Sequence, residues 1–191
     1  MADIPPPAVA LAAVPGRRKR TLELAREIER RGFSGIYCAT YGDAVGLCEA
    51  LALVTERIPF GTAIANIYTR HVSEYAMTAS LIQEISDGRV HFGVGVSHVP
   101  FLARLGLEGG KPLGDMRRFV EEFRAVPRAG ELPPLVVAGL RKKMVALSAE
   151  IAEGVVFANA SRSHRPESLT ALPEERRGDP TFFFGTMIPT C

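Results

Sequence analysis

The sequence predicts an α/β protein built on a parallel sheet, and three observations support this prediction. Short apolar segments alternate with amphipathic ones along the chain, the apolar segments are more continuous than alternating, and turn residues separate most of them. Strands of this kind are buried on both faces, with helices outside the sheet. Both a doubly wound open sheet and a (β/α)8 barrel have this order of elements, and periodicity leaves both open.

The expected strands share short apolar runs that end at turn residues. The first, at residues 8–14, ends at Pro15-Gly16, and the fourth follows Asp87-Gly88, a typical helix stop. The seven predicted strands cover residues 8–14, 35–38, 58–64, 89–96, 135–138, 155–158 and 181–188.

The expected helices lie between these strands. The first, at residues 21–31, has Leu24 and Ile28 four positions apart and ends at Gly32, and Asp43 is suited to cap the second. Further helices are expected from Val72 to Asp87 and at residues 115–126 and 142–152, with a broken helix around Pro173. The stretch 100–114 is expected to be irregular.

The composition excludes several classes of protein. The chain has 191 residues, of which 47% are hydrophobic and 23% charged, which excludes wholesale disorder, and its net charge of +2 gives no reason to expect a nucleic-acid or acidic-membrane partner. No apolar run is long enough to span a bilayer, and the N-terminus lacks the order of a signal peptide. The three cysteines have no metal-like spacing. We therefore expect a single cytoplasmic domain over residues 1–191, with no metal site.

Two segments carry residues suited to a site. Gly93-Val94-Gly95-Val96-Ser97 lies where a strand ends and would let a backbone approach a ligand, although a dinucleotide fingerprint would need glycine at His98. Residues 61–71 place Asn66, Tyr68, Thr69, Arg70 and His71 after the third strand, where parallel sheets build their sites. The alternatives are glycines needed only for packing and, for Arg70 and His71, a solvated helix start.

Four segments in order resemble one family. They are residues 61–71 (GTAIANIYTRH), 85–95 (ISDGRVHFGVG), 134–140 (PLVVAGL) and 147–156 (LSAEIAEGVV). Together they resemble the bacterial luciferase-like superfamily, in particular its deazaflavin-dependent branch of methylenetetrahydromethanopterin reductase-like oxidoreductases. The resemblance implies a (β/α)8 TIM barrel of the luciferase-like type. It is incomplete here, with about seven strands, because the chain ends at Cys191 before an eighth unit.

The resemblance also implies where the cofactor lies. The ring would cross the carboxyl ends of the strands, backed by a bulge with a cis peptide at Ala63-Ile64. The phosphate or polar tail would meet loops that flank one later helix. The cofactor-binding residues implied are Ala63, Ile64, Asn66, Gly95, Val96, Ser97, Gly139, Leu140 and Gly154.

The family's acid–base pair is replaced in this sequence. Members that use a sugar phosphate carry a histidine after the second strand and a glutamate after the fourth, where this chain has Thr40 and His98. These two are the catalytic candidates, with His98 the expected proton donor or acceptor because histidine titrates near neutral pH.

The expected function is hydride transfer between a deazaflavin, coenzyme F-420, or FMN and an organic substrate. The deazaflavin is favoured because residues 66–71 resemble that branch most. Two alternatives stay open: a non-catalytic barrel remnant that binds cofactor weakly or not at all, and a doubly wound nucleotide-binding protein that uses Gly93 and Gly95. We also expect self-association, since an open barrel edge would leave apolar residues such as Phe182 and Phe184 uncovered.

Overall fold

The computed structural model describes residues 6–40, 42–158 and 164–188. These residues form one sheet of seven parallel strands whose spatial order is the chain order. A doubly wound sheet reverses its order at a switch point, so the sequential order excludes that alternative. The strands are β1 (Val9–Leu11), β2 (Ile36–Cys38), β3 (Phe60–Asn66), β4 (Val90–Gly95), β5 (Leu135–Ala138), β6 (Gly154–Ala158) and β7 (Phe183–Met187).

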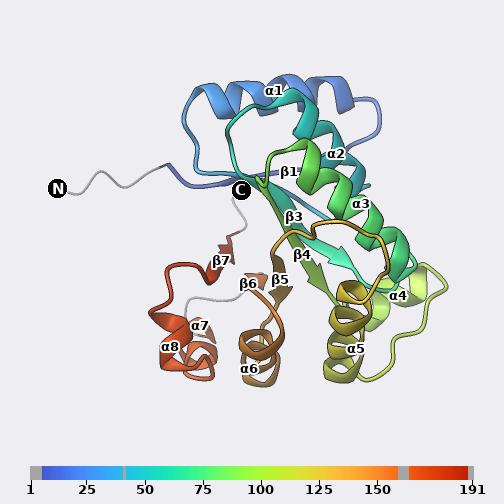
Figure 1. Cartoon of the computed structure of the whole chain (residues 1–191), viewed down its shortest axis with the longest axis vertical. Helices are drawn as coiled ribbons and strands as arrows, with labels where there is room; N and C mark the ends of the chain where they lie inside the picture. Colours follow the sequence, from blue (N-terminus) through green and yellow to red (C-terminus); the bar gives the residue numbers. More distant parts are fainter. Residues whose placement is uncertain (1–5, 41, 159–163, 189–191) are drawn as a thin grey trace.

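The sheet curls into an incomplete barrel with the helices on its outer side (Figure 1). In the described part of the chain, no helix is both long enough and apolar enough to cross a bilayer. The helices are α1 (Arg18–Arg30), α2 (Ala44–Val54), α3 (Val72–Ile85), α4 (Val99–Arg104), α5 (Pro112–Arg124), α6 (Lys142–Ile151), α7 (His164–Leu169) and α8 (Glu174–Arg177).

Two of the helical predictions needed correction. Helix α4 lies at the start of the stretch expected to be irregular. Its Pro100 is compatible with a helix because the first-turn N–H groups have no partner within the helix. The broken helix around Pro173 is instead two separate helices, with Pro173 at the N-cap of α8.

The core lies between the outer face of the sheet and the helices. Its main cluster joins β1–β5 to α1–α3, α5 and α6. A smaller cluster joins residues of α6 and β6 to Leu172 and Phe182. Phe182 is only 6% exposed. The expectation that Phe182 lies on an uncovered apolar face is therefore wrong, because its ring packs in this cluster beneath the Arg176 guanidinium.

A charged side chain fixes the loop that leads into β3. One carboxylate oxygen of Glu29, on α1, accepts hydrogen bonds from the backbone N–H groups of Glu56, Arg57 and Ile58 at 2.7–2.9 Å. Burial raises the pKa of Glu29, but the three backbone donors outweigh it and leave the pKa below its ordinary value. The ionised carboxylate thus ties α1 to the amino end of the sheet.

Arg89, just before β4, fixes the same end from the other side. Its guanidinium lies over the Phe60 ring, 5.2 Å from the centroid. It donates five hydrogen bonds of 2.9–3.2 Å, to the carbonyls of Ala52, Thr55, Ile58 and Ser86 and to the Thr55 hydroxyl. Every nitrogen of the guanidinium is therefore used to hold the backbone at the C-termini of α2 and α3.

Two cysteines meet inside the core. Cys38, at the end of β2, and Cys48, on α2, are both fully buried with their Sγ atoms 3.6 Å apart. Burial, together with the neighbouring Cys38, raises the pKa of the Cys48 thiol well above its ordinary value. Both pack as small buried side chains. Cys191 lies outside the described residues.

Candidate functional site

A bulge shapes the carboxyl end of β3. Thr62 pairs with Phe92 and Ala65 with Val94, so Ala63 and Ile64 together oppose Gly93 alone. A Cβ atom on Gly93 would lie 2.2 Å from the Thr62 carbonyl oxygen and 2.6 Å from that of Ala63. The glycine is therefore required by the close approach of the bulged backbone.

The predicted cis peptide at Ala63-Ile64 is wrong. The irregularity lies at the predicted residues, but all peptide bonds in the described part of the chain are trans. The missing side chain of Gly93 gives the extra residue of β3 the room that the bulge needs.

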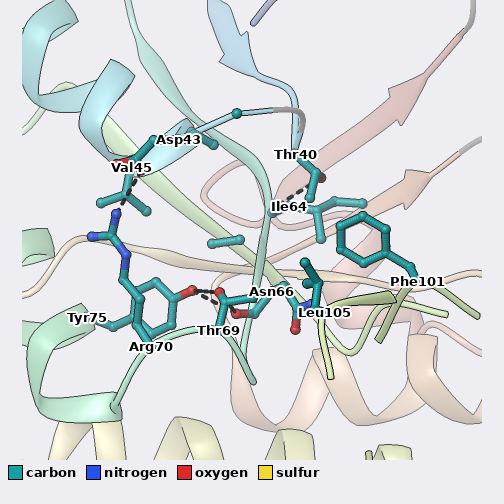
Figure 2. Close-up of a pocket in the computed structure, with 13 residues that line it drawn as sticks. Thr40, Asp43, Val45, Ile64, Asn66, Thr69, Arg70, Tyr75, Phe101 and Leu105 are labelled. Atoms are coloured by element: carbon teal, nitrogen blue, oxygen red, sulfur yellow. Dashed lines mark hydrogen bonds and ion pairs between the residues drawn. The ribbon is translucent and has the colours of Figure 1, made fainter. Parts of the chain in front are cut away.

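A cavity of about 420 Å³ opens at the carboxyl ends of β2 and β3 (Figure 2). Its polar lining comes from the loops after these two strands, and its apolar lining comes from the bulge, the start of α2 and the α4 segment. The lining residues are Thr40, Gly42, Asp43, Ala44, Val45, Ile64, Ala65, Asn66, Thr69, Arg70, Tyr75, Phe101 and Leu105.

Asn66 is the most constrained polar residue of this cavity. Its backbone oxygen accepts hydrogen bonds from the Tyr75 hydroxyl at 2.7 Å and from the Thr69 hydroxyl at 2.9 Å. Its side-chain Oδ1 accepts from the Tyr68 N–H at 3.0 Å, whereas the buried Nδ2 has no hydrogen-bond partner among the described residues. The amide therefore keeps both N–H donors of its NH₂ group unused.

The predicted residue Thr40 does reach the cavity. Its hydroxyl donates a hydrogen bond to the Ile64 carbonyl oxygen at 3.0 Å, which joins the end of β2 to the bulge. Because the proton is engaged there, the hydroxyl oxygen has lone pairs to accept a hydrogen bond from a ligand. The geometry gives Thr40 a structural contact and a possible ligand contact.

An ion pair that the sequence did not predict lies beside the cavity. Arg70 Nη2 is 2.8 Å from Asp43 Oδ1, and the same carboxylate caps α2 by accepting from the Gly46 N–H. The pair connects the loops after β2 and β3. His71 caps α3 and is exposed, as the solvated alternative for this residue expects.

A second polar contact supports the loop from behind. Tyr68 donates its hydroxyl to the buried carboxylate of Asp115, on α5, at 2.7 Å, and the Gly110 N–H donates to the same oxygen. Burial, assisted by the Asp115 carboxylate, raises the pKa of Tyr68 to about 12. Sequence reasoning noted Tyr68 but could not find Asp115, which lies 47 positions further along the chain.

The predicted site residues on the loop after β4 differ in whether they lie near the cavity. Gly95 lies against the cavity wall, since a Cβ there would be 2.7 Å from an Ile64 methyl carbon. Val96 and Ser97 follow, with Ser97 in the left-handed region at φ 60°. His98 is the exposed N-cap residue of α4, and its side chain makes no capping hydrogen bond. It is outside the cavity lining, whereas Phe101 and Leu105 of the same segment are part of it.

The predicted phosphate loops do not come together. Gly139 and Leu140 follow β5 and lead into α6, at the same edge of the sheet as the cavity. Gly154 pairs with Val136 near the start of β6, about 10 Å back along the strand direction. A Cβ on Gly154 would lie 2.6 Å from the Cβ of Phe183, so this glycine serves strand packing. The phosphate contact expected of Gly154 stays a prediction.

A larger cavity of about 780 Å³ lies inside the curl of the sheet and contacts both β1 and β7. His91 and Tyr37 face it, and burial lowers the pKa of His91 and raises that of Tyr37 to about 12. The His91 ring lies 4.9 Å from that of Phe183, inside the curl of the sheet.

The sequence is similar to that of known proteins of one family. A sequence model of the luciferase-like monooxygenase family matches residues 7–127. The chain belongs to this family. A 5,10-methylenetetrahydromethanopterin reductase from Archaeoglobus fulgidus is 35% identical over 134 residues, which is 58% of this chain and 39% of that protein. The chain therefore spans well under half the length of this relative.

Solved structures of the family share the fold. The coenzyme F-420-dependent tetrahydromethanopterin reductase from Methanopyrus kandleri superposes with a TM-score of 0.76 at 18% identity, over 91% of this chain and 61% of that one. A type II Baeyer-Villiger monooxygenase from Pseudomonas putida, in complex with FMN, gives 0.71 at 13% identity over 95% and 66%. The luciferase-like barrel expected from the sequence is confirmed, in its incomplete form.

Proposed function

We propose that the chain holds the ring of a deazaflavin or flavin in the cavity at the end of β3 and supports hydride transfer between that ring and an organic substrate. One observation carries the proposal. In a chain of the luciferase-like monooxygenase family, the β3 bulge opens a cavity at the carboxyl edge of the sheet, where such barrels bind their ligands.

The residues present fit such a ring. Ile64, Phe101 and Leu105 offer apolar contacts to its faces, and Asn66 offers an unused hydrogen-bond donor to its polar edge. Coenzyme F-420 is favoured over FMN because residues 66–71 resemble the deazaflavin branch and because a similar protein from Archaeoglobus fulgidus is a methylenetetrahydromethanopterin reductase.

We assign the polar tail of the cofactor to the start of α6. Gly139 and Leu140 lead into this helix, whose N-cap residue is Arg141 and whose first two residues are Lys142 and Lys143. Cations at a helix N-terminus oppose the macrodipole, and a bound anion would relieve this while meeting the first-turn amides. Glu167 already pairs with Lys142 at 3.2 Å.

The protein's part in the reaction is to bind, orient and exclude water. When bound, the cofactor accepts or gives the hydride, so the hard chemistry is its own. Phe101 and Leu105 would shield the ring from solvent. The proton that accompanies the hydride is assigned to His98, which starts the segment carrying these two residues.

Cofactor binding is the direct test. Titration with coenzyme F-420 and with FMN, followed by fluorescence, should give saturable binding that Thr40→Trp abolishes by filling the cavity. Thr78→Trp, on α3 outside the cavity, is the matched control and should bind like the parent. If the folded parent protein binds neither coenzyme F-420 nor FMN, the proposal is contradicted.

The role of His98 has its own test. His98→Ala should lower turnover roughly a hundredfold, the usual size of a general acid–base contribution, and leave cofactor affinity unchanged. His71→Ala is the control because His71 is also an exposed histidine at a helix N-cap. Equal turnover in the two variants removes His98 from the mechanism.

A non-catalytic, cofactor-binding protein is the second candidate. The observation that favours it is that, among the described lining residues, Asp43 is the one carboxylate, and it is already paired with Arg70. This candidate predicts normal cofactor binding but no change in the redox state of the bound ring with any hydride donor or acceptor.

We also propose self-association through α2 and α3. Met77, Leu81 and Ile85 form an exposed apolar stripe four residues apart on α3, and Leu53 on α2 is 76% exposed. Such patches mark contact surfaces in soluble proteins. Leu81→Lys should shift light scattering toward monomer, whereas Leu24→Lys on α1 should not.

A further inference from the structure

The segment between β4 and α5, residues 97–109, forms its hydrogen bonds within itself. The backbone N–H groups of Phe101 and Leu102 donate to the His98 carbonyl oxygen at 2.9 and 3.0 Å. The N–H of Leu107 donates back to the Leu102 carbonyl oxygen at 3.0 Å. No hydrogen bond or ion pair joins this segment to any other described part of the chain. The segment is therefore a local structure attached to the fold mainly through its two ends.

The side-chain packing of the segment is also mostly local. Leu102 is only 3% exposed but belongs to neither core cluster. A Cβ atom on Gly109 would lie 2.9 Å from Leu102 Cδ1 and 3.5 Å from the Tyr68 hydroxyl oxygen, so Leu102 packs against the far end of its own segment. Val99 and Leu105 are 79% and 48% exposed. A loop that is packed by its own side chains can open as a unit while the core stays folded.

Both ends of the segment adjoin fixed points of the fold. At one end, the Gly95 carbonyl oxygen accepts a backbone hydrogen bond from the loop after β3 at 3.1 Å. At the other, the Gly110 N–H donates to the buried Asp115 carboxylate at 2.9 Å. Just inside these points lie Ser97, in the left-handed region at φ 60°, and Gly109. A strained serine and a glycine are suited to take up a change of backbone angle.

One face of the segment forms a wall of the cavity at the end of β3. Phe101 and Leu105, four positions apart, both line it, and Figure 2 shows them on the side opposite Asp43 and Arg70. Phe101 is only half-buried and Leu105 is still more exposed. This wall therefore presents apolar surface that a ligand in the cavity could cover.

We propose that residues 97–109 are a lid that pivots at its two ends and closes over the cavity when a ligand fills it. The inference rests on the proposed function for the identity of that ligand. Closure buries Phe101 and Leu105 against the ring, a gain of apolar burial that the empty cavity does not offer, so the ligand favours the closed state. Closure also moves His98 with the lid, which gives a histidine outside the cavity lining a way to reach the ring.

Hydrogen exchange in the protein without ligand tests whether the lid moves as a unit. The amides of residues 99–107 should exchange together, about 10-fold or more faster than those of α5. Ser97→Val disfavours the left-handed pivot, because β-branched residues avoid positive φ, and should speed exchange in the lid about 10-fold without affecting β4. Arg128→Val is the matched control, since Arg128 also has a φ of 60° but lies outside the cavity lining. If Ser97→Val does not fold, exchange in the parent decides.

Binding kinetics test whether the lid closes on a ligand. The chain contains no tryptophan, so Val99→Trp places a single fluorescent reporter on an exposed position of the lid outside the cavity lining. Stopped-flow mixing with coenzyme F-420, and separately with FMN, should give two phases. The rate of the slower phase should level off as the ligand concentration rises, because closure follows binding. Glu122→Trp, exposed on α5, is the control and should show only the phase whose rate rises linearly.

Collective exchange in the lid together with a saturating phase supports the inference. Three results overturn it: lid amides that exchange no faster than those of α5, an effect of Ser97→Val that spreads into β4, or a single linear phase from the Val99→Trp reporter. Each of these describes a fixed wall. If the folded parent binds neither cofactor, the proposed function fails separately, and hydrogen exchange still decides whether the lid is a hinged unit.

Discussion

The two ends of the sheet use their polar side chains in opposite ways. At the amino end, Arg89 donates five hydrogen bonds and one oxygen of Glu29 accepts three, all but one of them with backbone groups. At the carboxyl end, the Asn66 amide keeps an unused donor, and the Thr40 hydroxyl keeps lone pairs free. Arg89 and Glu29 are thus fully used by the protein itself, although Gln83 Oε1 near the same end has no partner among the described residues, whereas Asn66 and Thr40 keep unused capacity.

The difference separates stability from binding. A polar group that has all its partners in the folded chain contributes to folding and has nothing left for a ligand. A buried group without a partner costs stability, and it is retained where a ligand supplies the partner. Substitutions at the two ends should therefore differ in what they change.

The largest expected effect comes from Gly93, on which the shape of the carboxyl end depends. Gly93→Ala places a Cβ 2.2 Å from the Thr62 carbonyl oxygen, so the bulge must move, at a cost of about 3 kcal/mol or more in unfolding free energy. Gly114→Ala on α5 has open space around it and should be neutral or stabilising by up to about 1 kcal/mol. Urea denaturation measures both, and equal stability of the two variants would contradict the assigned role of Gly93.

A substitution of Arg89 tests the amino end of the sheet alone. Arg89→Met removes the guanidinium donor from four carbonyls, of which that of Ser86 still accepts from the backbone N–H of residue 89, and should lower the unfolding free energy by about 2–3 kcal/mol. Arg57→Met removes an exposed arginine of the same end and should cost less than about 0.5 kcal/mol. Cofactor affinity of folded Arg89→Met should equal that of the parent, and a large loss of affinity would show that the two ends are coupled.

Glu29 gives a pH-dependent version of the same test. Its pKa is lowered in the folded state, so its contribution is complete above the ordinary value of 4.5 and is lost as the pH falls below it. Glu29→Gln should cost about 1 kcal/mol at pH 7, and the difference from the parent should shrink toward pH 3. Glu84→Gln, exposed on α3, should show no such trend. A pH-independent difference would contradict the role of the ionised carboxylate.

The Asp43–Arg70 pair should give the smallest effect. Asp43→Asn preserves a good N-cap for α2 while removing the charge, so it isolates the ion pair from the cap. Because both side chains are substantially exposed, the change in unfolding free energy should stay below about 0.5 kcal/mol and vanish in 0.5 M salt. A loss above 1 kcal/mol that persists in salt would show that the pair stabilises the loops.

The sequence predicted the elements better than the contacts between them. Apolar runs and turn residues located all seven strands, because a buried parallel strand leaves a local signature. The partners of Glu29 and Arg89 are mainly backbone groups, and the Tyr68 partner of Asp115 is distant in sequence, so no local pattern marks these contacts.

The candidate site was predicted in place but not in detail. Residues 61–71 identified the end of β3, since polar groups cluster there, and the resemblance placed the irregularity at Ala63-Ile64. The peptide bonds of the bulge are trans, and the bulge depends on the space that Gly93 leaves on a neighbouring strand. The position of Gly154 depends on a neighbouring strand in the same way, because its register with Val136, rather than its identity, decides at which end of the sheet it lies.

The rate at which a reagent modifies the buried thiols of Cys38 and Cys48 would measure local opening of the structure. A thiol reagent reaches neither sulfur while β2 and α2 stay packed, since both side chains are fully buried. Modification of a Cys191→Ser variant must therefore wait for that unit to separate, and its rate measures how often separation occurs. A ligand that bridges the loops after β2 and β3 would slow the modification in proportion to its occupancy, which turns a chemical labelling rate into a binding isotherm.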